Sequence, residues 1–302
     1  MTIFKKIAYG LIKKLKFLPP EFYIKIYYEY YTGKPLNLKS PVEFNEKIQW
    51  LKVYYKPELL TKLVDKYEVR DFIKNKIGET YLTELIGVYK SYDEIDFNKL
   101  PQQFVLKGTH GSNYNLIVKD KTKLNKAKAR QLVNKWLGRN YYYRGGLEWA
   151  YKNVPPRVII EAFMKDKKHD DLPDYKFFCF NGVPKMVQID LGRQDHHTRV
   201  FYDLSWNKLP ITKGKIPMYK GNVDKPETLD EMSKLAKVLS ESFPFARVDF
   251  FSVNGITKFG EITFYPGDGR TEFYPEKYNT YFGDLMRLPS IPKNQNYITE
   301  IN

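Results

Sequence analysis

A lysine followed by two glycines forms a candidate phosphate-binding loop in the first half of the chain. Lys107 follows the apolar run 103–106, and Gly108, Gly111 and Ser112 lie in the short segment after it. Glycines let backbone N–H groups approach a phosphate closely, and a lysine adds a positive charge. The lysine precedes the glycines and no helix follows directly, so the segment is not a Walker loop. An ordinary hairpin turn is the alternative interpretation.

Two acidic residues in apolar, strand-like runs form a candidate metal site. Asp249 and Glu261 lie on either side of the turn residues Asn254 and Gly255. A carboxylate in an apolar strand is costly unless it has a partner. Mg²⁺ takes one or two carboxylates and completes its shell with phosphate oxygens and water, so the pair suits this ion. The alternatives are two exposed strand carboxylates, or a salt bridge with Arg247.

The alternation of side chains along a strand decides whether the two acids can share a metal. They must point to the same face of their hairpin, which requires Asp249 to lie opposite Glu261. A two-residue loop would place Asp249 opposite Gly260 instead. We therefore predict a three-residue loop, built on a type I turn with Gly255 in the left-handed region and making a glycine bulge. In this register polar and apolar residues separate, and we expect both carboxylates to face Lys107.

A third group of residues has the chemistry needed to hold a nucleoside. Glu161 lies in the last part of an apolar run and can accept a hydrogen bond from an adenine amino group. Asp174 can bind ribose hydroxyls, and Lys176 can face phosphates. Arg193 follows in a polar stretch. The adjacent histidines 196–197 are expected in a solvated loop, because neighbouring residues do not share a face of a strand.

The elements that must position these residues divide into a helical first part and a body richer in strands. Residues 3–18 have apolar residues at helical spacing, 22–31 form a second helical stretch, and Ser40 is expected to cap a helical region that extends, with breaks, to Lys76. Strand-like runs follow at 103–106, 115–119, 158–163, 175–180, 185–190, 199–203, 247–253 and 256–264, and helices are expected at 123–137 and 229–243. The pattern predicts an α+β fold rich in antiparallel pairs.

Composition and charge narrow the class of protein. With 302 residues, of which 42% are hydrophobic, the chain can form a sizeable core, and disorder is excluded for most of its length. The single cysteine, Cys179, excludes an internal disulfide and fits a reducing cytosol. The net charge of +15 attracts anions, which include nucleotides, nucleic acids, acidic glycans and anionic membrane surfaces.

No segment of the sequence predicts export or a membrane span. No apolar stretch approaches the roughly 20 residues that cross a bilayer, and the apolar core at 7–12 is too short for a signal peptide. We therefore expect a cytoplasmic protein. Residues 3–18 carry five lysines beside an apolar stripe, so they can lie on the inner face of an anionic membrane. The alternative is a surface helix packed on the domain.

The order of the motifs resembles that of the ATP-grasp superfamily, and most closely its TupA-like branch. That order is a Lys–Gly loop at 107–113, a strand ending in Glu161, an Asp-x-Lys strand at 174–176, and then Arg-x-Asp, Glu-x-Thr and Pro-Gly within 247–267. The similarity covers about 40–288. TupA-like proteins are predicted amide-forming ligases of cell-surface polysaccharide biosynthesis. The resemblance implies an ATP-grasp fold, in which two antiparallel-sheet subdomains enclose the nucleotide after a helical N-terminal region.

The resemblance also implies a division of the chain. We expect a helical N-terminal region at 1–60, a catalytic body at 61–290 and a tail at 291–302. Within the body, the subdomain with the nucleotide loop covers about 100–160, and the C-terminal subdomain covers about 161–290.

Several residues acquire a role from the resemblance. The implied nucleotide-binding set is Arg70, Lys107, Gly108, Gly111, Ser112, Glu161, Phe163 and Asp174. The segment 65–70 resembles the entry to the nucleotide site, with Arg70 where a phosphate-contacting lysine is usual. Phe163 with the preceding glutamate resembles the hinge that reads adenine. Lys176 and Arg193 resemble the basic pair that steadies the transferring γ-phosphate.

The implied metal ligands and the remaining catalytic residues lie in the C-terminal half. Asp249 and Glu261 resemble metal-bridging acids, and Thr263 stands where the family usually has asparagine. A hydroxyl can still bind Mg²⁺. Arg247 completes the catalytic set, and Arg270 is the candidate for binding the carboxylate of an acidic substrate.

The activity that the resemblance implies is an ATP- and Mg²⁺-dependent carboxylate–amine ligation. A carboxylate of an acidic sugar or glycan attacks the γ-phosphate to form an acylphosphate, and an amine donor such as an amino acid displaces phosphate. Two alternatives are a glycosyl-transferring or kinase-like enzyme of the same pathway, and a non-enzymatic module that binds acidic glycan or nucleic acid. Two acids inside an anion-binding body argue against the module, so we expect no nucleic-acid partner.

Overall fold

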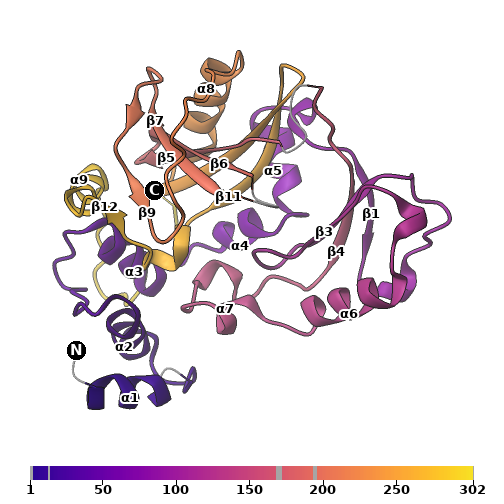
Figure 1. Cartoon of the computed structure of the whole chain (residues 1–302). Helices are drawn as coiled ribbons and strands as arrows, with labels where there is room; N and C mark the ends of the chain where they lie inside the picture. Colours follow the sequence, from indigo (N-terminus) through magenta and orange to yellow (C-terminus); the bar gives the residue numbers. More distant parts are fainter. Residues whose placement is uncertain (1–2, 13, 168–171, 193–195, 302) are drawn as a thin grey trace.

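Two antiparallel sheets form the body of the molecule, with the N-terminal helices beside the larger sheet (Figure 1). The computed structural model describes residues 3–12, 14–167, 172–192 and 196–301. Within these residues, one sheet has four strands, a second has six, and a short third sheet has two. The predicted α+β fold, with helices preceding two antiparallel sheets, is confirmed.

The N-terminal part contains the helices α1 (Ile3–Ile12), α2 (Pro20–Thr32), α3 (Phe44–Tyr54), α4 (Glu58–Val64) and α5 (Val69–Lys76). The single helix predicted for 3–18 is wrong, because α1 ends at Ile12. Turns replace the helix before Pro19, with the Leu15 N–H bonded to the Ile12 carbonyl at 2.8 Å. Across the described residues, no helix combines the length and apolar character that a membrane span requires.

The start of α3 also differs from its prediction. Ser40 does not cap the helix, which begins four residues later with Glu43 and Glu46 in a capping box. The Ser40 N–H instead donates to Asn37 Oδ1 at 3.0 Å, and the Asn37 side chain donates to the Ser40 carbonyl. Ser40 is therefore held in the turn before the helix.

The smaller sheet has its own hydrophobic core. Its strands, in spatial order, are β1 (Leu85–Tyr89), β4 (Val158–Ala162), β2 (Phe104–Gly108) and β3 (Asn115–Val118). Helix α6 (Lys126–Leu137) packs on this sheet, where Val133 and Trp136 share a core with Phe104 and Ile160. Strand β1 was not predicted, because its Leu-Ile-Gly-Val-Tyr run is short and interrupted by a glycine.

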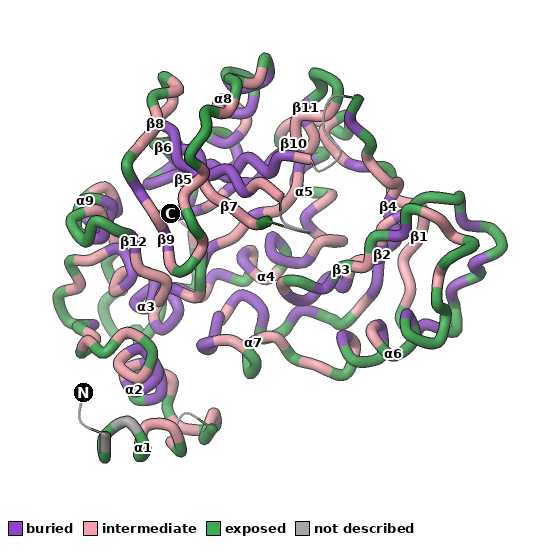
Figure 2. The backbone as a smooth tube through the Cα atoms, in the orientation of Figure 1, coloured by how far each residue is buried: buried purple, intermediate pink, exposed green. Residues whose placement is uncertain are grey.

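The larger sheet separates an apolar layer from the candidate site. Its strands, in spatial order, are β11 (Ile256–Thr263), β10 (Phe245–Val253), β5 (Asp174–Phe180), β6 (Val183–Leu191), β7 (Thr198–Asp203) and β8 (Lys208–Leu209). Helix α8 (Leu229–Ser240) covers one face, where Cys179 Sγ lies 3.9 Å from the Ala236 carbonyl. On the other face, Phe180 packs against Phe44 of α3 and Phe282 of α9 (Lys277–Leu285). Figure 2 shows these central strands as mostly buried.

The β10–β11 hairpin has the predicted register. Asp249 lies opposite Glu261, while Phe250 pairs with Phe259. Gly260 is therefore an extra residue on β11, and the resulting bulge shifts the pairing by one position. A Cβ at Gly260 would lie 3.0 Å from the Asp249 carbonyl oxygen, so a larger residue here would crowd the backbone of β10.

The turn of this hairpin is different from the one predicted. Val253 pairs with Ile256, so the loop has two residues rather than three. Asn254 and Gly255 have φ angles of 51° and 77°, and positive values at both positions characterise a type I′ turn. The prediction placed the bulge in the loop, whereas it lies inside β11.

Candidate active site

The acid pair of the β10–β11 hairpin holds a guanidinium group between its carboxylates. Arg247 Nη2 lies 2.7 Å from Asp249 Oδ2 and 2.9 Å from Glu261 Oε1. Thr263 Oγ1 lies 3.2 Å from the same nitrogen. The three predicted metal ligands therefore share one face of the hairpin. The salt bridge with Arg247, which the sequence left open, is also present.

Burial disfavours the ionised form of Asp249. Its residue is only 2% exposed, and burial raises its pKa to about 6, although Arg247 and Lys176 act in the opposite direction. Burial alone would lower the pKa of Arg247, but Asp249 and Glu261, together with Asp174, outweigh it and raise that pKa. The pKa of this carboxyl stays raised although two cations are close, so a further positive charge would stabilise its ionised form.

Lys176 connects the acid pair to two more carboxylates of the same sheet. It pairs with Asp249 across β5 and β10, and its Nζ lies 3.1 Å from Asp249 Oδ2. The same nitrogen forms an ion pair with Asp174 and lies 3.9 Å from Asp190 Oδ2. All four residues are buried. Asp174, which is predicted to bind ribose hydroxyls, therefore lies next to Lys176, which is predicted to face the phosphates.

A second charged cluster lies on the smaller sheet. Val105 pairs with Glu161, so Lys107, two residues further along β2, lies on the same face as Glu161. Lys107 Nζ is 2.6 Å from Glu161 Oε2, and Arg70 Nη1 is 3.0 Å from Oε1. Both carboxylate oxygens of the residue predicted to bind adenine therefore contact cations in this structure.

A narrow gap of about 20 Å³ lies where the two sheets approach each other, between these cations and β11. Arg70, Lys107 and Glu161 line it from one side, and Gly260 lines it from the other. The elements that the sequence predicts around the nucleotide therefore meet at this gap.

Lys66 bridges the two sheets and was not among the predicted site residues. Its Nζ donates to the Gly111 carbonyl at 2.8 Å and lies 3.9 Å from Glu261 Oε2. Burial lowers its pKa, while Glu261 acts in the opposite direction. We predicted that the acids would face Lys107, but Lys66 forms the ion pair with Glu261. Its position in the segment 65–70, which resembles a nucleotide-site entry, was the available signal.

The predicted phosphate loop is a hairpin connection between β2 and β3. Gly108 donates to the Tyr114 carbonyl at 2.8 Å, which closes the loop. A Cβ at Gly108 or Gly111 would lie 2.9 Å or 2.7 Å from atoms of Tyr114. Both glycines are therefore required by the packing of this tyrosine. Ser112 lines a cavity of about 410 Å³ beside the loop.

Three predicted residues do not join the main cluster. Phe163 lines a separate, wide hollow next to Ala162. Arg270 lies in the cavity beside the phosphate loop, where its Nε is 2.9 Å from Asp268 Oδ2. Arg193 lies outside the described residues.

Sequence reasoning missed a third group of charged residues on the larger sheet. Asp190 Oδ1 lies 2.6 Å from Arg199 Nε and 3.1 Å from His197 Nε2, so His197 contacts the site rather than only solvent. Burial opposes ionisation of Asp190, but Arg199, Lys176 and His197 together outweigh it and hold the pKa of that carboxyl below its usual value. Lys213, in β9 (Thr212–Lys213), is also buried, and burial together with Arg199 and Arg247 lowers its pKa strongly. An acid at the end of an apolar run was the available signal for Asp190.

The oxygen atoms on the hairpin fit the requirements of Mg²⁺. Asp249, Glu261 and Thr263 all direct oxygens at Arg247 Nη2, which shows that this point accommodates a cation. In the part of the chain that the structure describes, no group of three or more His, Cys, Asp or Glu residues could hold a metal by itself. Phosphate oxygens and water must therefore supply the remaining ligands, as is usual for this ion.

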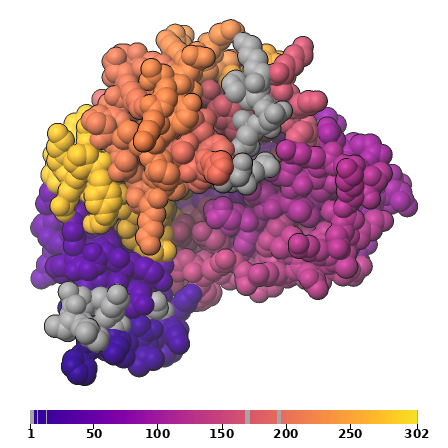
Figure 3. All heavy atoms as spheres, viewed as in Figure 1, coloured from indigo at the N-terminus to yellow at the C-terminus, as the bar shows by residue number. Residues whose placement is uncertain are grey.

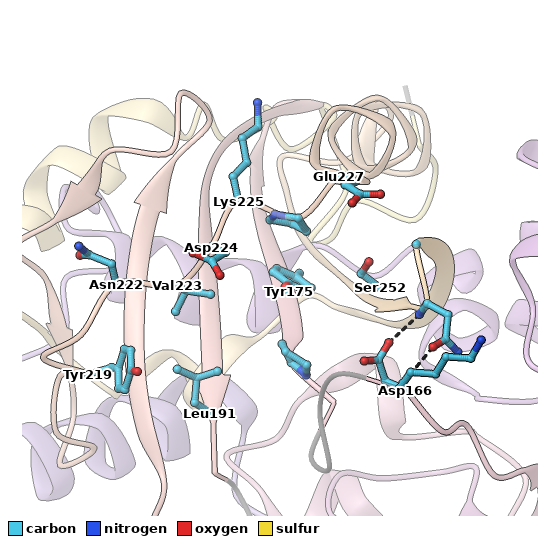
Figure 4. A pocket seen from close by; sticks show the side chains of 15 residues that line it. Asp166, Tyr175, Leu191, Tyr219, Asn222, Val223, Asp224, Lys225, Glu227 and Ser252 are labelled. Carbon is cyan, nitrogen blue, oxygen red and sulfur yellow. Dashed lines mark hydrogen bonds between the residues drawn. The ribbon is translucent and has the colours of Figure 1, made fainter.

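A larger cavity, of about 590 Å³, lies on the opposite face of the larger sheet (Figure 4). Tyr175 lines it and points away from the neighbouring Asp174 and Lys176, because side chains alternate along β5. At its edge, Asp166 accepts a hydrogen bond from the Asn254 N–H at 2.6 Å. None of the predicted site residues that the structure describes lines this cavity, so it is not the candidate active site.

The sequence matches a known protein family over most of its length. Residues 46–287 match the TupA-like ATP-grasp family. Solved structures with similarity include D-alanine–D-alanine ligase from Bacillus anthracis complexed with ATP, with 15% identity, TM-score 0.41 and coverage of 72% of this chain and 60% of that one. Phosphoribosylamine–glycine ligase from Thermotoga maritima has 16% identity and TM-score 0.42, with coverage of 70% and 50%. A RimK-domain ATP-grasp protein from Sphaerobacter thermophilus has 10% identity and TM-score 0.41, with coverage of 75% and 69%.

The chain is shorter than the first of these structures, since it spans about 60% of the Bacillus anthracis ligase. No curated protein matches the sequence.

Proposed function

Because this chain belongs to the TupA-like ATP-grasp family, we propose that it uses ATP to join a carboxylate to an amine. Family membership supports the predicted enzyme class and the predicted cofactors, ATP and Mg²⁺. In the proposed reaction, a substrate carboxylate attacks the γ-phosphorus and ADP leaves. The amine then attacks the carbonyl carbon of the acylphosphate, an amide bond forms, and phosphate is released.

The observation that carries this proposal is the shared face of Asp249, Glu261 and Lys176. Two carboxylates from adjacent strands lie directly opposite each other, and a buried lysine from the third strand contacts one of them. This arrangement supports a divalent cation and a phosphate side by side, which is the requirement of phosphoryl transfer to a carboxylate. A purely anion-binding surface has no use for buried acids at its centre.

The described residues divide the work of the first step. Mg²⁺, when bound to the acid pair, would neutralise charge on the phosphate oxygens. Lys107 approaches from the smaller sheet, Lys66 from the turn between α4 and α5, and Lys176 from the larger sheet. Held in place by the fold, these positive charges would stabilise the transferring phosphoryl group more strongly than free cations in solution.

The substrates follow from the charge of the protein and from the family. We propose that the carboxylate belongs to an acidic sugar or glycan precursor of a cell-surface or capsular polysaccharide, and that the amine donor is an amino acid. A net charge of +15 favours the approach of an acidic substrate.

The experiment is a screen for ADP release over uronic acids paired with amino acids, with and without Mg²⁺. The proposal expects ADP release that requires both organic substrates and the metal. Asp249→Asn should abolish it, whereas Glu227→Gln, at an exposed position beside the cavity of Figure 4, should leave it unchanged. Release of ADP that is independent of any amine would instead indicate a kinase-like enzyme.

We also propose that α1 holds the enzyme on an anionic membrane, where lipid-linked glycan precursors are found. Phe4 and Phe17 are 87% and 81% exposed, and Ile7 and Leu11 are exposed beside them. The helix packs on α2 and protrudes at the edge of the molecule (Figure 3). Apolar side chains among lysines suit insertion at the level of anionic headgroups.

A further inference from the structure

A basic cavity of about 410 Å³ lies beside the predicted phosphate loop. Ser112 lines it from the loop, Lys135 and Arg139 from the end of α6 and the residues after it, and Arg144 from α7 (Tyr141–Arg144). Among the described residues, none of these three basic side chains forms an ion pair. The cavity therefore offers several unused positive charges next to the site of phosphoryl transfer.

One carboxyl group in this cavity has no counterion in contact. Glu148 is 5% exposed, and among the described residues its carboxyl forms neither a hydrogen bond nor an ion pair within 4.0 Å. Its acidic neighbour Asp268 has partners that satisfy both of its oxygens. Lys52 forms an ion pair with one oxygen, and Arg270 and Tyr27 each donate to the other at 2.9 Å.

The surroundings of Glu148 favour its neutral form. Burial is the main cause, and Asp268 adds to it, so the pKa of Glu148 is raised to about 8, although Lys52, Arg270 and Arg247 act in the opposite direction. Tyr141 and Tyr151, from α7 and the short helix η4 (Trp149–Tyr151), also interact with it electrostatically, as does Tyr265. A ligand with a positive charge is what this carboxyl lacks.

We propose that this cavity binds the amine substrate as a free amino acid, with its ammonium group on Glu148 and its carboxylate on the basic residues Arg139 and Arg144. This inference rests on the proposed ligase function and assigns Glu148 as the base for its second step. An amino acid is the ligand whose two charges match one uncompensated carboxyl beside several uncompensated cations.

The chemistry of the second step requires such a base. An ammonium group has no electron pair, so its nitrogen must first transfer one proton to the Glu148 carboxylate. The free amine then attacks the carbonyl carbon of the acylphosphate and a C–N bond forms. The C–O bond to phosphate breaks, and the second proton of the nitrogen leaves with the phosphate.

The test begins with binding to the full chain, measured as a shift in melting temperature. Mg·ADP is added first, and its stabilising effect tests the proposed function. Each common amino acid is then added at millimolar concentration. At least one should stabilise the complex further, and its carboxamide, which lacks the carboxylate, should bind more weakly.

The variant Glu148→Gln separates this inference from the proposed function. It should keep the response to Mg·ADP and weaken amino-acid binding by roughly thirtyfold or more, because the ammonium loses a buried charged partner. Glu227→Gln is the matched control and should bind like the wild type. If Mg·ADP stabilises the protein but no amino acid does so, or if Glu148→Gln binds the amino acid unchanged, the inference is wrong while the proposed function stands.

Hydroxylamine provides a second, catalytic readout. It is unprotonated near neutral pH, so it can open an acylphosphate without a base. The reaction contains ATP, hydroxylamine and the carboxylate that the ADP-release screen identifies. Glu148→Gln should therefore still form the hydroxamate, whereas it should no longer form the amide with the amino acid. Equal loss of both products would assign Glu148 a structural role and overturn the inference.

Discussion

The raised pKa of Glu148 has a measurable effect on stability that does not depend on knowing any substrate. Glutamine has the same shape as a neutral glutamate but cannot ionise. We therefore compare the pH dependence of stability between the wild type and Glu148→Gln. The two proteins should differ only in the free energy needed to ionise this buried carboxyl.

The magnitude follows from the two pKa values. The ordinary value is 4.5, and burial with the nearby Asp268 raises the pKa of Glu148 to about 8 in the folded chain. Between these values the folded state binds more protons than the unfolded state, so wild-type stability falls as pH rises. Across the whole interval between the two pKa values, the free energy of unfolding of the wild type falls by about 5 kcal/mol. About 3 kcal/mol of this is lost between about pH 5 and about pH 7.5.

Urea denaturation at several pH values measures this difference directly. The free energy of unfolding of Glu148→Gln, relative to the wild type, should increase by about 3 kcal/mol across that interval and level off above about pH 8. Subtracting the two curves cancels other groups that titrate, such as Asp249. Glu227→Gln should give a curve parallel to the wild type. Parallel curves for Glu148→Gln would refute the reasoning, since they would mean that the carboxyl is already ionised in the folded protein at neutral pH.

Four further predictions concern the nucleotide site, the hairpin and the membrane. ATP or ADP should raise the melting temperature only with Mg²⁺. At a concentration of about 100 Kd the free energy of unfolding should increase by about 2.7 kcal/mol, and the absence of any shift in melting temperature would exclude the nucleotide site. Lys107→Ala should reduce turnover far more than stability, whereas Lys176→Ala should also cost about 3–5 kcal/mol in urea denaturation, because it removes one cation from a cluster of buried carboxylates. Gly260→Ala should destabilise the protein by about 1–3 kcal/mol, because its Cβ would crowd the backbone of β10. Deleting 3–18 should abolish co-sedimentation with vesicles containing phosphatidylserine, and unchanged binding would contradict the membrane proposal.

The sequence predicted best those features that depend on neighbours along the chain. The strands at 158–162 and 245–263 and the helix α8 follow from alternation and helical spacing, which are local properties. Helix ends were predicted less well. At Ser40, a serine followed three residues later by glutamate matched a capping box, but the actual box is formed by Glu43 and Glu46. Two overlapping patterns of the same type cannot be separated by spacing alone.

Contacts between distant parts of the chain were beyond reach of the sequence. Glu148 and Asp268 are 120 positions apart, and no local pattern indicates that only one of them finds cations. Lys66 reaches both Gly111, in the loop between β2 and β3, and Glu261, in β11 of the larger sheet. The family resemblance placed individual motifs near the nucleotide, but it could not show which charge neutralises which. That distribution depends on packing, which the order of the motifs does not contain.

The β10–β11 hairpin shows how a correct conclusion can rest on an incorrect cause. The predicted register places Asp249 and Glu261 on one face and the apolar residues on the other. It depends only on burial, and the structure confirms it. Any single extra residue between the two acids satisfies this requirement, so burial cannot locate it. Turn chemistry should have decided the matter, because Asn254-Gly255 strongly favours a two-residue type I′ loop. Given that loop, the extra residue must lie within a strand, and Gly260, directly before Glu261, is the glycine whose missing side chain leaves room for the bulge.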